Sequence, residues 1–354
     1  MAEAEHSDKN YKSNISHTHQ GAMVSAPIPV LICDDSAFAR KQMVRALSEW
    51  NVTITEASHG LEALEAVRAG KGHLLFLDLN MPILDGYQVL ERIRSQDLQT
   101  LVVVVSGDIQ SEARERVMAL GALGFINKPI DAKILRDALG EYGLADELEH
   151  RSKLAVDNAN RQATLEELYQ ELSNVAMGRA GALLSELLGV FVQLPVPKAR
   201  INTADDIAVL LEQLRLETNT SATLCQGFIG PDISGEALLI FDQHSLEDMA
   251  RLLGSDDELT AARQHEMLLD VANVLISAYL GELGRQIDID FSQGTPVILG
   301  QHYHLPEPEA LRRWKRTLTI EVGYRIEGFN ISCNLLLLFT EDSIDALNER
   351  ARYL

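Results

Sequence analysis

The chain has 354 residues, a length typical of about two domains. Its 46% apolar and 23% charged residues fit folded domains and exclude a largely disordered chain. The net charge of −21, and the absence of any apolar run near the roughly 20 residues that a bilayer requires, argue against nucleic-acid and membrane binding. Cys33, Cys225 and Cys333 are scattered, which is typical of reduced thiols and a cytoplasmic location.

Residues 1–27 are polar and are expected to form a flexible leader. In residues 28–143, five apolar runs alternate with five stretches of helical period, which predicts a doubly wound α/β domain with a five-stranded parallel sheet. The expected strands are Val30–Cys33, Thr53–Ala57, Leu74–Leu77, Leu101–Val105 and Gly124–Ile126. The expected helices are Ala37–Glu49, Leu61–Ala69, Gly86–Ser95, Ser111–Leu120 and Ala132–Tyr142.

Residues 144–165 are charged and helix-prone and are expected to form a helical linker. Residues 166–354 contain an internal repeat. Glu171-x-x-Asn174 recurs as Asp270-x-x-Asn273, and a proline follows each pair, so that both the pair and the proline are displaced by 99 residues. The repeat predicts an α+β domain of two similar halves that share one sheet with pseudo-twofold symmetry.

Polar residues follow the predicted strands of the first domain. Asp34 and Asp35 follow the first strand, Asp78 the third, Ser106 the fourth and Lys128 the fifth. The carboxyl ends of parallel strands converge at one edge of such a sheet. Clustered carboxylates repel one another unless a cation neutralises them, and Mg²⁺ suits such oxygen ligands. Asp78, on the central strand, is the natural nucleophile for a phosphoryl group, with Lys128 and Ser106 stabilising its charge.

At these residues the chain resembles the response-regulator receiver family, of which CheY is the familiar member and which has a flavodoxin-like fold. The matching motifs are Asp34-Asp35-Ser36, Leu77-Asp78-Leu79-Asn80-Met81-Pro82 with Asp85-Gly86, Ser106-Gly107 and Lys128-Pro129. The resemblance implies that a histidine kinase donates a phosphoryl group to Asp78. It implies that Asp35, Asp78 and the backbone carbonyl of Asn80 bind Mg²⁺ with support from Asp34, and that Ser106 and Phe125 form the switch. Phe125 can equally be an ordinary core aromatic residue.

Glu171 and Asn174 are three residues apart on a predicted helix and share one face. Small and apolar residues surround them, so a partner could approach closely. An amide can orient a water molecule for attack on a phosphoryl group, and a carboxylate can pair with a lysine. This reading requires that the amides be accessible to a docking protein.

This half resembles the CheC/CheX/FliY phosphatase family, whose pattern is Glu-x-x-Asn followed 23 residues later by proline; here Pro197 follows Asn174, and Pro296 follows Asn273, by that spacing. The resemblance implies that the asparagine aligns the hydrolytic water in a partner receiver and that the glutamate holds its lysine. Glu171 with Asn174 forms the better-matched centre. Asp270, which forms the second centre with Asn273, is one methylene shorter than glutamate.

A second departure is that Glu167 and Glu266 stand four residues before each acid, where the family tends to have aspartate or serine. They add negative charge near both centres. These departures favour the alternative that the second domain is a non-catalytic binding or dimerisation module.

The sequence therefore predicts a two-component response regulator that is phosphorylated on Asp78. Its output domain is expected to hydrolyse aspartyl phosphate on a receiver protein, either a CheY-like partner or its own receiver. The expected partners are a histidine kinase and a phosphorylated receiver, and a homodimer is a further option. A DNA-binding output is disfavoured, because no basic recognition helix follows residue 150. The sequence does not identify the kinase, the target or the pathway.

Overall fold

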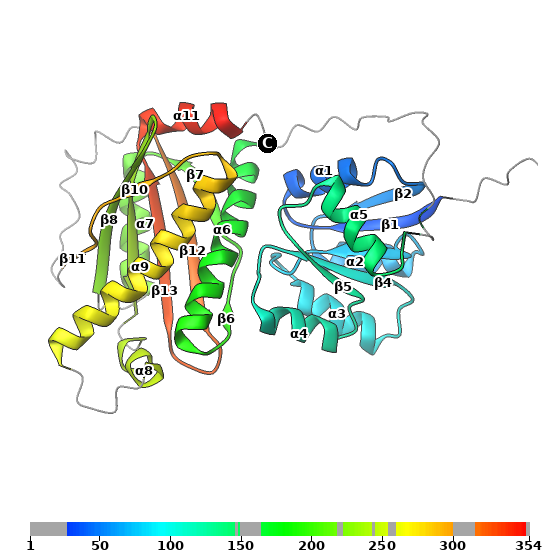
Figure 1. The fold of residues 1–354 in the computed structure, drawn as a ribbon, viewed down its shortest axis with the longest axis horizontal. Helices are drawn as coiled ribbons and strands as arrows, with labels where there is room; N and C mark the ends of the chain where they lie inside the picture. Colours follow the sequence, from blue (N-terminus) through cyan, green and yellow to red (C-terminus); the bar gives the residue numbers. More distant parts are fainter. Residues whose placement is uncertain are drawn as a thin grey trace, which may run out of the picture.

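The computed structural model describes residues 27–145, 148, 164–217, 222–242, 245–253, 260–299 and 316–351. Most of the expected leader and of the expected linker lies outside these residues. Two α/β units stand side by side, and helix α6 of the second faces the first (Figure 1).

The first unit has a five-stranded parallel sheet with the order β2-β1-β3-β4-β5. Its strands are short and mostly apolar, as expected for a sheet covered on both faces. They are β1 (Ile28–Cys33), β2 (Val52–Ala57), β3 (Leu74–Leu77), β4 (Leu101–Ser106) and β5 (Gly124–Asn127).

Five helices cover the two faces of this sheet: α1 (Ala37–Ala46), α2 (Gly60–Arg68), α3 (Gly86–Ser95), α4 (Ser111–Ala119) and α5 (Ala132–Glu141). Two hydrophobic cores result, and their buried members all lie between residues 30 and 148. Helix α1 ends at Ala46 rather than at Glu49, because the chain turns there and buries Trp50 in the core beside α1 and α5. The expected doubly wound fold is confirmed.

The second unit has an eight-stranded sheet with the central order β10-β8-β9-β13-β12-β6; β11 also pairs with β8, and β7 with β12. Two long hairpins, β8–β9 and β12–β13, meet along an antiparallel β9–β13 pairing, which gives the shared sheet of two similar halves. The strands are β6 (Val192–Gln193), β7 (Lys198–Asn202), β8 (Ala222–Gly230), β9 (Ile233–Phe241), β10 (Ser292–Gln293), β11 (Val297–Leu299), β12 (Thr317–Ile326) and β13 (Ser332–Phe339).

Two long helices, α6 (Leu165–Leu188) and α9 (Ala261–Gln286), pack against each other and against this sheet. Shorter helices complete the unit: α7 (Ala204–Glu217), α8 (Ser245–Leu252) and α11 (Glu341–Ala351). Among the described residues, α9 is long and apolar enough by length and composition to cross a membrane. Its apolar face is buried in the hydrophobic core of the second unit, for example at Val271 and Leu275, which accounts for that composition.

Candidate functional site

The strand ends of the first unit bring the predicted acidic residues together. Asp34 and Asp35 follow β1, and Asp78 follows β3. One oxygen from each of these three carboxylates lies within 4.8 Å of the others. Lys128 follows β5 and reaches the same place, so the convergence expected for parallel strands is present in the structure.

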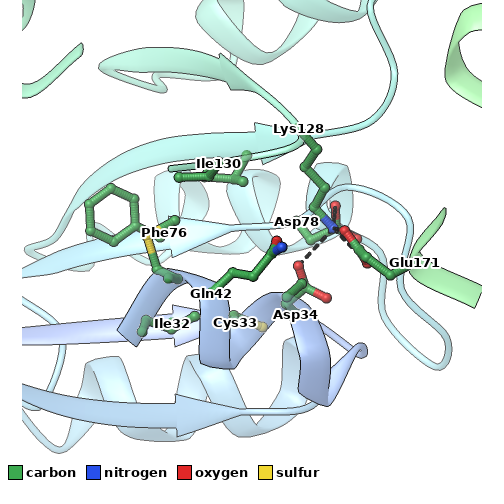
Figure 2. A pocket seen from close by; sticks show the side chains of 12 residues that line it. Ile32, Cys33, Asp34, Gln42, Phe76, Asp78, Lys128, Ile130 and Glu171 are labelled. Atoms are coloured by element: carbon green, nitrogen blue, oxygen red, sulfur yellow. Dashed lines mark hydrogen bonds and ion pairs between the residues drawn. The ribbon is translucent and has the colours of Figure 1, made fainter. Parts of the chain in front are cut away.

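Lys128 lies at the centre of this cluster (Figure 2). Its Nζ lies 2.8 Å from Oδ2 of Asp34 and 3.3 Å from Oδ1 of Asp78. A third carboxylate reaches it from the second unit: Oε1 of Glu171 lies 3.1 Å from the same nitrogen. The single ammonium group therefore lies within 3.3 Å of an oxygen of each of the three acids.

Local backbone geometry holds the acidic residues in place. Ser36 caps α1, and its amide donates to Asp34 Oδ1 at 2.8 Å. The amide of Asn80 donates to Asp78 Oδ2 at 3.1 Å. Gly86 is required here, because a Cβ at this position would lie 2.4 Å from the carbonyl oxygen of Asp78. The start of α3 therefore packs directly under the Asp78 loop.

Burial and crowding perturb the titration of the cluster. Burial raises the pKa of Asp35 to about 7, with the neighbouring Asp34 charge adding to the effect. Burial also raises the pKa of Asp78 well above its ordinary value, against the opposing effect of Lys128. Burial opposes the charge on Lys128, but the surrounding carboxylates raise its pKa well above its ordinary value, so it stays protonated. The site thus contains one permanently charged ammonium group, that of Lys128, among several carboxyl groups.

The donor set fits a hard divalent cation. All three clustered ligands are carboxylates, and oxygen ligands of this kind suit Mg²⁺. Asp78 Oδ1 is buried and makes no hydrogen bond, although Lys128 lies nearby. An orphaned carboxylate oxygen beside two further carboxylates is the arrangement that a bound cation would complete.

Helix α6 supplies a second set of polar groups to this site. Glu171 and Asn174 are 6% and 3% exposed, and both face the first unit. Asn174 Oδ1 accepts a hydrogen bond from Asn80 Nδ2 at 3.3 Å. One turn earlier, Gln170 Nε2 donates to Asp35 Oδ2 at 3.0 Å. Burial raises the pKa of Glu171, and Lys128 counteracts this. The amide expected to be open to a docking protein is covered by the first unit of its own chain.

Two further contacts fix α6 and its neighbours on the first unit. Gln110, just before α4, makes a reciprocal pair with the backbone of Val192 in β6: its Nε2 donates to the carbonyl oxygen at 2.8 Å, and its Oε1 accepts from the amide at 3.0 Å. Gly107 and Gly178 touch backbone to backbone, because a Cβ on Gly178 would lie 1.7 Å from the Gly107 carbonyl oxygen. The first contact depends on the planar amide of Gln110, and the second depends on the absence of a side chain at Gly178.

The predicted switch residues are both buried in the first unit. Ser106 is fully buried, and its Oγ accepts from the amide of Asp108 at 3.1 Å. Phe125 is 7% exposed and packs in the core beside α2, α3 and α4. The Tyr142 hydroxyl bonds to the amide and carbonyl of Phe125 at 3.1 and 2.9 Å. This structure therefore holds Phe125 as a buried core residue.

The second centre lies apart from this site. Asp270 and Asn273 are exposed on α9, and no contact joins them to the first unit among the described residues. Glu167, expected to add charge near the first centre, instead forms a capping box at the start of α6, where its Oε2 accepts from the amide of Thr164 at 2.8 Å. Its carboxylate therefore caps the N-terminus of α6.

Sequence reasoning missed four participants: Gln170, Gln110, Gly178 and the side chain of Asn80. Gln170 could have been found from its place beside Glu171 on the helix. Gln110 carries no motif, and its role depends on a contact with Val192 across 82 residues of sequence.

Comparisons with known proteins support the interpretation of the first unit as a receiver domain. The response regulator receiver domain matches residues 30–140. The chemotaxis protein CheY of Halobacterium salinarum is 30% identical over 112 residues, which cover 32% of this chain and 93% of that protein. A protein-glutamate methylesterase/protein-glutamine glutaminase of Myxococcus xanthus is 43% identical over 109 residues, which cover 30% of this chain and 31% of that protein.

The matches to methylesterase relatives span between about a third and a half of those proteins' lengths. Among solved structures, FliY of Thermotoga maritima is similar over 53% of this chain and 96% of that chain, with 17% identity and a TM-score of 0.40.

Proposed function

The chain belongs to the response-regulator receiver family through its first unit, and from this premise we propose that it hydrolyses the phosphate it receives. Asp78 accepts a phosphoryl group from a histidine kinase, and the CheC-like second unit removes that group from the same chain. The observation that carries the proposal is the contact of Glu171 and Asn174 with the receiver site: Glu171 lies 3.1 Å from Lys128, and Asn174 bonds to Asn80 beside Asp78.

In the first step, a carboxylate oxygen of Asp78 attacks the phosphorus of a phosphohistidine. The new oxygen–phosphorus bond forms as the nitrogen–phosphorus bond breaks, and the imidazole leaves. Lys128 and the Ser106 hydroxyl stabilise the oxygens of the transferred group. Bound Mg²⁺, held by Asp35, Asp78 and the carbonyl of Asn80 with Asp34 in support, would supply charge neutralisation.

In the second step, a water oxygen attacks the phosphorus in line with the Asp78 oxygen. The phosphorus–oxygen bond to Asp78 breaks, which releases inorganic phosphate and restores the carboxylate. Asn174 has both donor and acceptor groups at the mouth of the site, so its amide can hold this water in position. Glu171 holds Lys128, which keeps the ammonium group fixed while charge develops.

Two matched asparagine substitutions test the proposal. Asn174→Ala should lengthen the lifetime of phospho-Asp78 by about 100-fold, the cost of misplacing one reacting group. Asn273→Ala removes the same amide from the equivalent place on α9 and should leave the lifetime unchanged. The chain is loaded with a small-molecule phosphodonor, the donor is removed, and phosphate release is followed over time.

The competing function is a non-catalytic cap, which is favoured by the burial of Asp78 at 1% exposure beneath α6. A cap would shield the acyl phosphate from water without activating it. Equal lifetimes in the wild type and in the Asn174→Ala chain would refute hydrolysis and leave the cap as the function of the second unit.

A further inference from the structure

Helix α6 reaches the receiver through a position that has no side chain. A Cβ on Gly178 would lie 1.7 Å from the carbonyl oxygen and 2.4 Å from the carbonyl carbon of Gly107. Real Cβ atoms do not approach a backbone this closely, and backbone cannot rotate away as a side chain can. Any residue other than glycine at 178 would therefore push the receiver away from Asn174.

The second half of the domain carries serine at the matching place. The displacement of 99 residues that relates Asn174 to Asn273 also relates Gly178 to Ser277. Ser277 is exposed on α9, and its Oγ donates to Gln293 Oε1 at 2.8 Å. If a receiver docked on α9 in the pose that the first unit takes on α6, the repeat would set the Cβ of Ser277 against the backbone of Gly107.

We propose that Gly178 is the specificity-determining residue that admits a receiver to α6, and that Ser277 closes the second centre to receivers. This inference rests on the proposed function for the identity of the docked reaction, but not for the contact itself. The shorter Asp270 adds to the closure, because it is one methylene short of the reach that Glu171 uses to meet Lys128.

The first arm of the test uses the full chain with Gly178→Ala. Alanine is the better helix former, so α6 itself should not be weakened. The lifetime of phospho-Asp78 should lengthen by about 100-fold, and the amide of Val192, which bonds to Gln110 of the receiver, should lose protection from hydrogen exchange. Gly281→Ala on α9 is the matched control, because a Cβ there meets nothing within 4 Å.

The second arm tests whether a receiver can dock on α9 once the Ser277 side chain is removed. The substrate is a phosphorylated receiver fragment of residues 27–148, which contains both of its hydrophobic cores. The enzyme is the full chain with Asp78→Asn and Asn174→Ala, so that α6 contributes no hydrolysis. Adding Asp270→Glu and Ser277→Gly should accelerate phosphate loss from the fragment at least roughly tenfold, and a further Asn273→Ala should abolish the gain.

Two results would overturn the inference. One is an unchanged lifetime and unchanged Val192 exchange in the Gly178→Ala chain. The other is equal phosphate loss from the fragment with and without Ser277→Gly. Failure of the proposed function has a different signature: Asn174→Ala would leave the lifetime unchanged, while Gly178→Ala would still expose the Val192 amide.

Discussion

Loss of the Gln110 side chain should shift the chain from the docked state, in which α6 covers the receiver site, toward an open state in which α6 has moved off it. The open state should be phosphorylated faster. Gln110→Ala removes both hydrogen bonds to the buried Val192 backbone, at 2.8 and 3.0 Å. Each bond contributes about 1 kcal/mol net, and the orphaned amide and carbonyl of Val192 add a desolvation cost, so the docked state should weaken by roughly 2 to 4 kcal/mol. This corresponds to an increase of about 30- to 1,000-fold in the ratio of open to docked chains.

The assay follows from the burial of Asp78, which is 1% exposed when α6 is docked. A phosphodonor can react only with the open fraction, so the observed rate is the intrinsic rate multiplied by that fraction. Gln110→Ala should raise the rate of phosphorylation by a small-molecule donor, up to the ceiling set by a fully open chain. It should also slow phosphate loss, because hydrolysis requires the docked state.

Gln99→Ala is the matched control, since Gln99 is exposed and bonds only to its neighbour Asp97 among the contacts described. Gly178→Ala disturbs the same interface from the other side and should produce the same pair of opposite changes. A Gln110→Ala chain that gains and loses phosphate at wild-type rates would refute the argument that docking controls access to Asp78.

Two further predictions concern stability. Burial raises the pKa of Asp108 to about 6, so the folded chain binds this proton more tightly than the unfolded chain. As the pH rises from about 4 to 6, the wild type should therefore lose roughly 3 kcal/mol of unfolding free energy relative to Asp108→Asn, measured by urea denaturation at each pH. Parallel plots of unfolding free energy against pH for the two chains would contradict this. Gly86→Ala places a Cβ 2.4 Å from the Asp78 carbonyl oxygen and should lower the unfolding free energy by about 1 to 3 kcal/mol. Gly140→Ala, whose Cβ would meet nothing within 4 Å, should not destabilise the chain in the same measurement; a loss equal to that of Gly86→Ala would count against steric crowding as the cause.

Local pattern was sufficient to predict most of the receiver fold. The strand Leu74–Leu77 and the helix Gly86–Ser95 have the predicted bounds, because an uninterrupted apolar run and a capped amphipathic stretch specify them locally. Helix α1 was predicted three residues too long, since the turn that buries Trp50 depends on packing against distant residues. The two halves of the second unit followed from the repeat.

The candidate site could be predicted only in its parts. The strand ends predicted where Asp34, Asp78 and Lys128 converge, because parallel topology brings these ends together. The covering of that cluster by α6 of the same chain was left open between a partner and the chain itself. It depends on the shape of two folded surfaces, and in particular on the close contact of Gly107 with Gly178, 71 residues away in sequence. The catalytic roles of Glu171 and Asn174 stay predictions.

The concentration dependence of phosphate loss tests most directly whether the second unit acts on its own receiver. Two sites on one chain act at an effective concentration of about a millimolar, so dilution of a micromolar solution does not separate them. The first-order rate constant for loss of phosphate from Asp78 should stay constant over an about hundredfold dilution of the protein. A rate constant that falls in proportion to protein concentration would show that one molecule dephosphorylates another and would contradict the account.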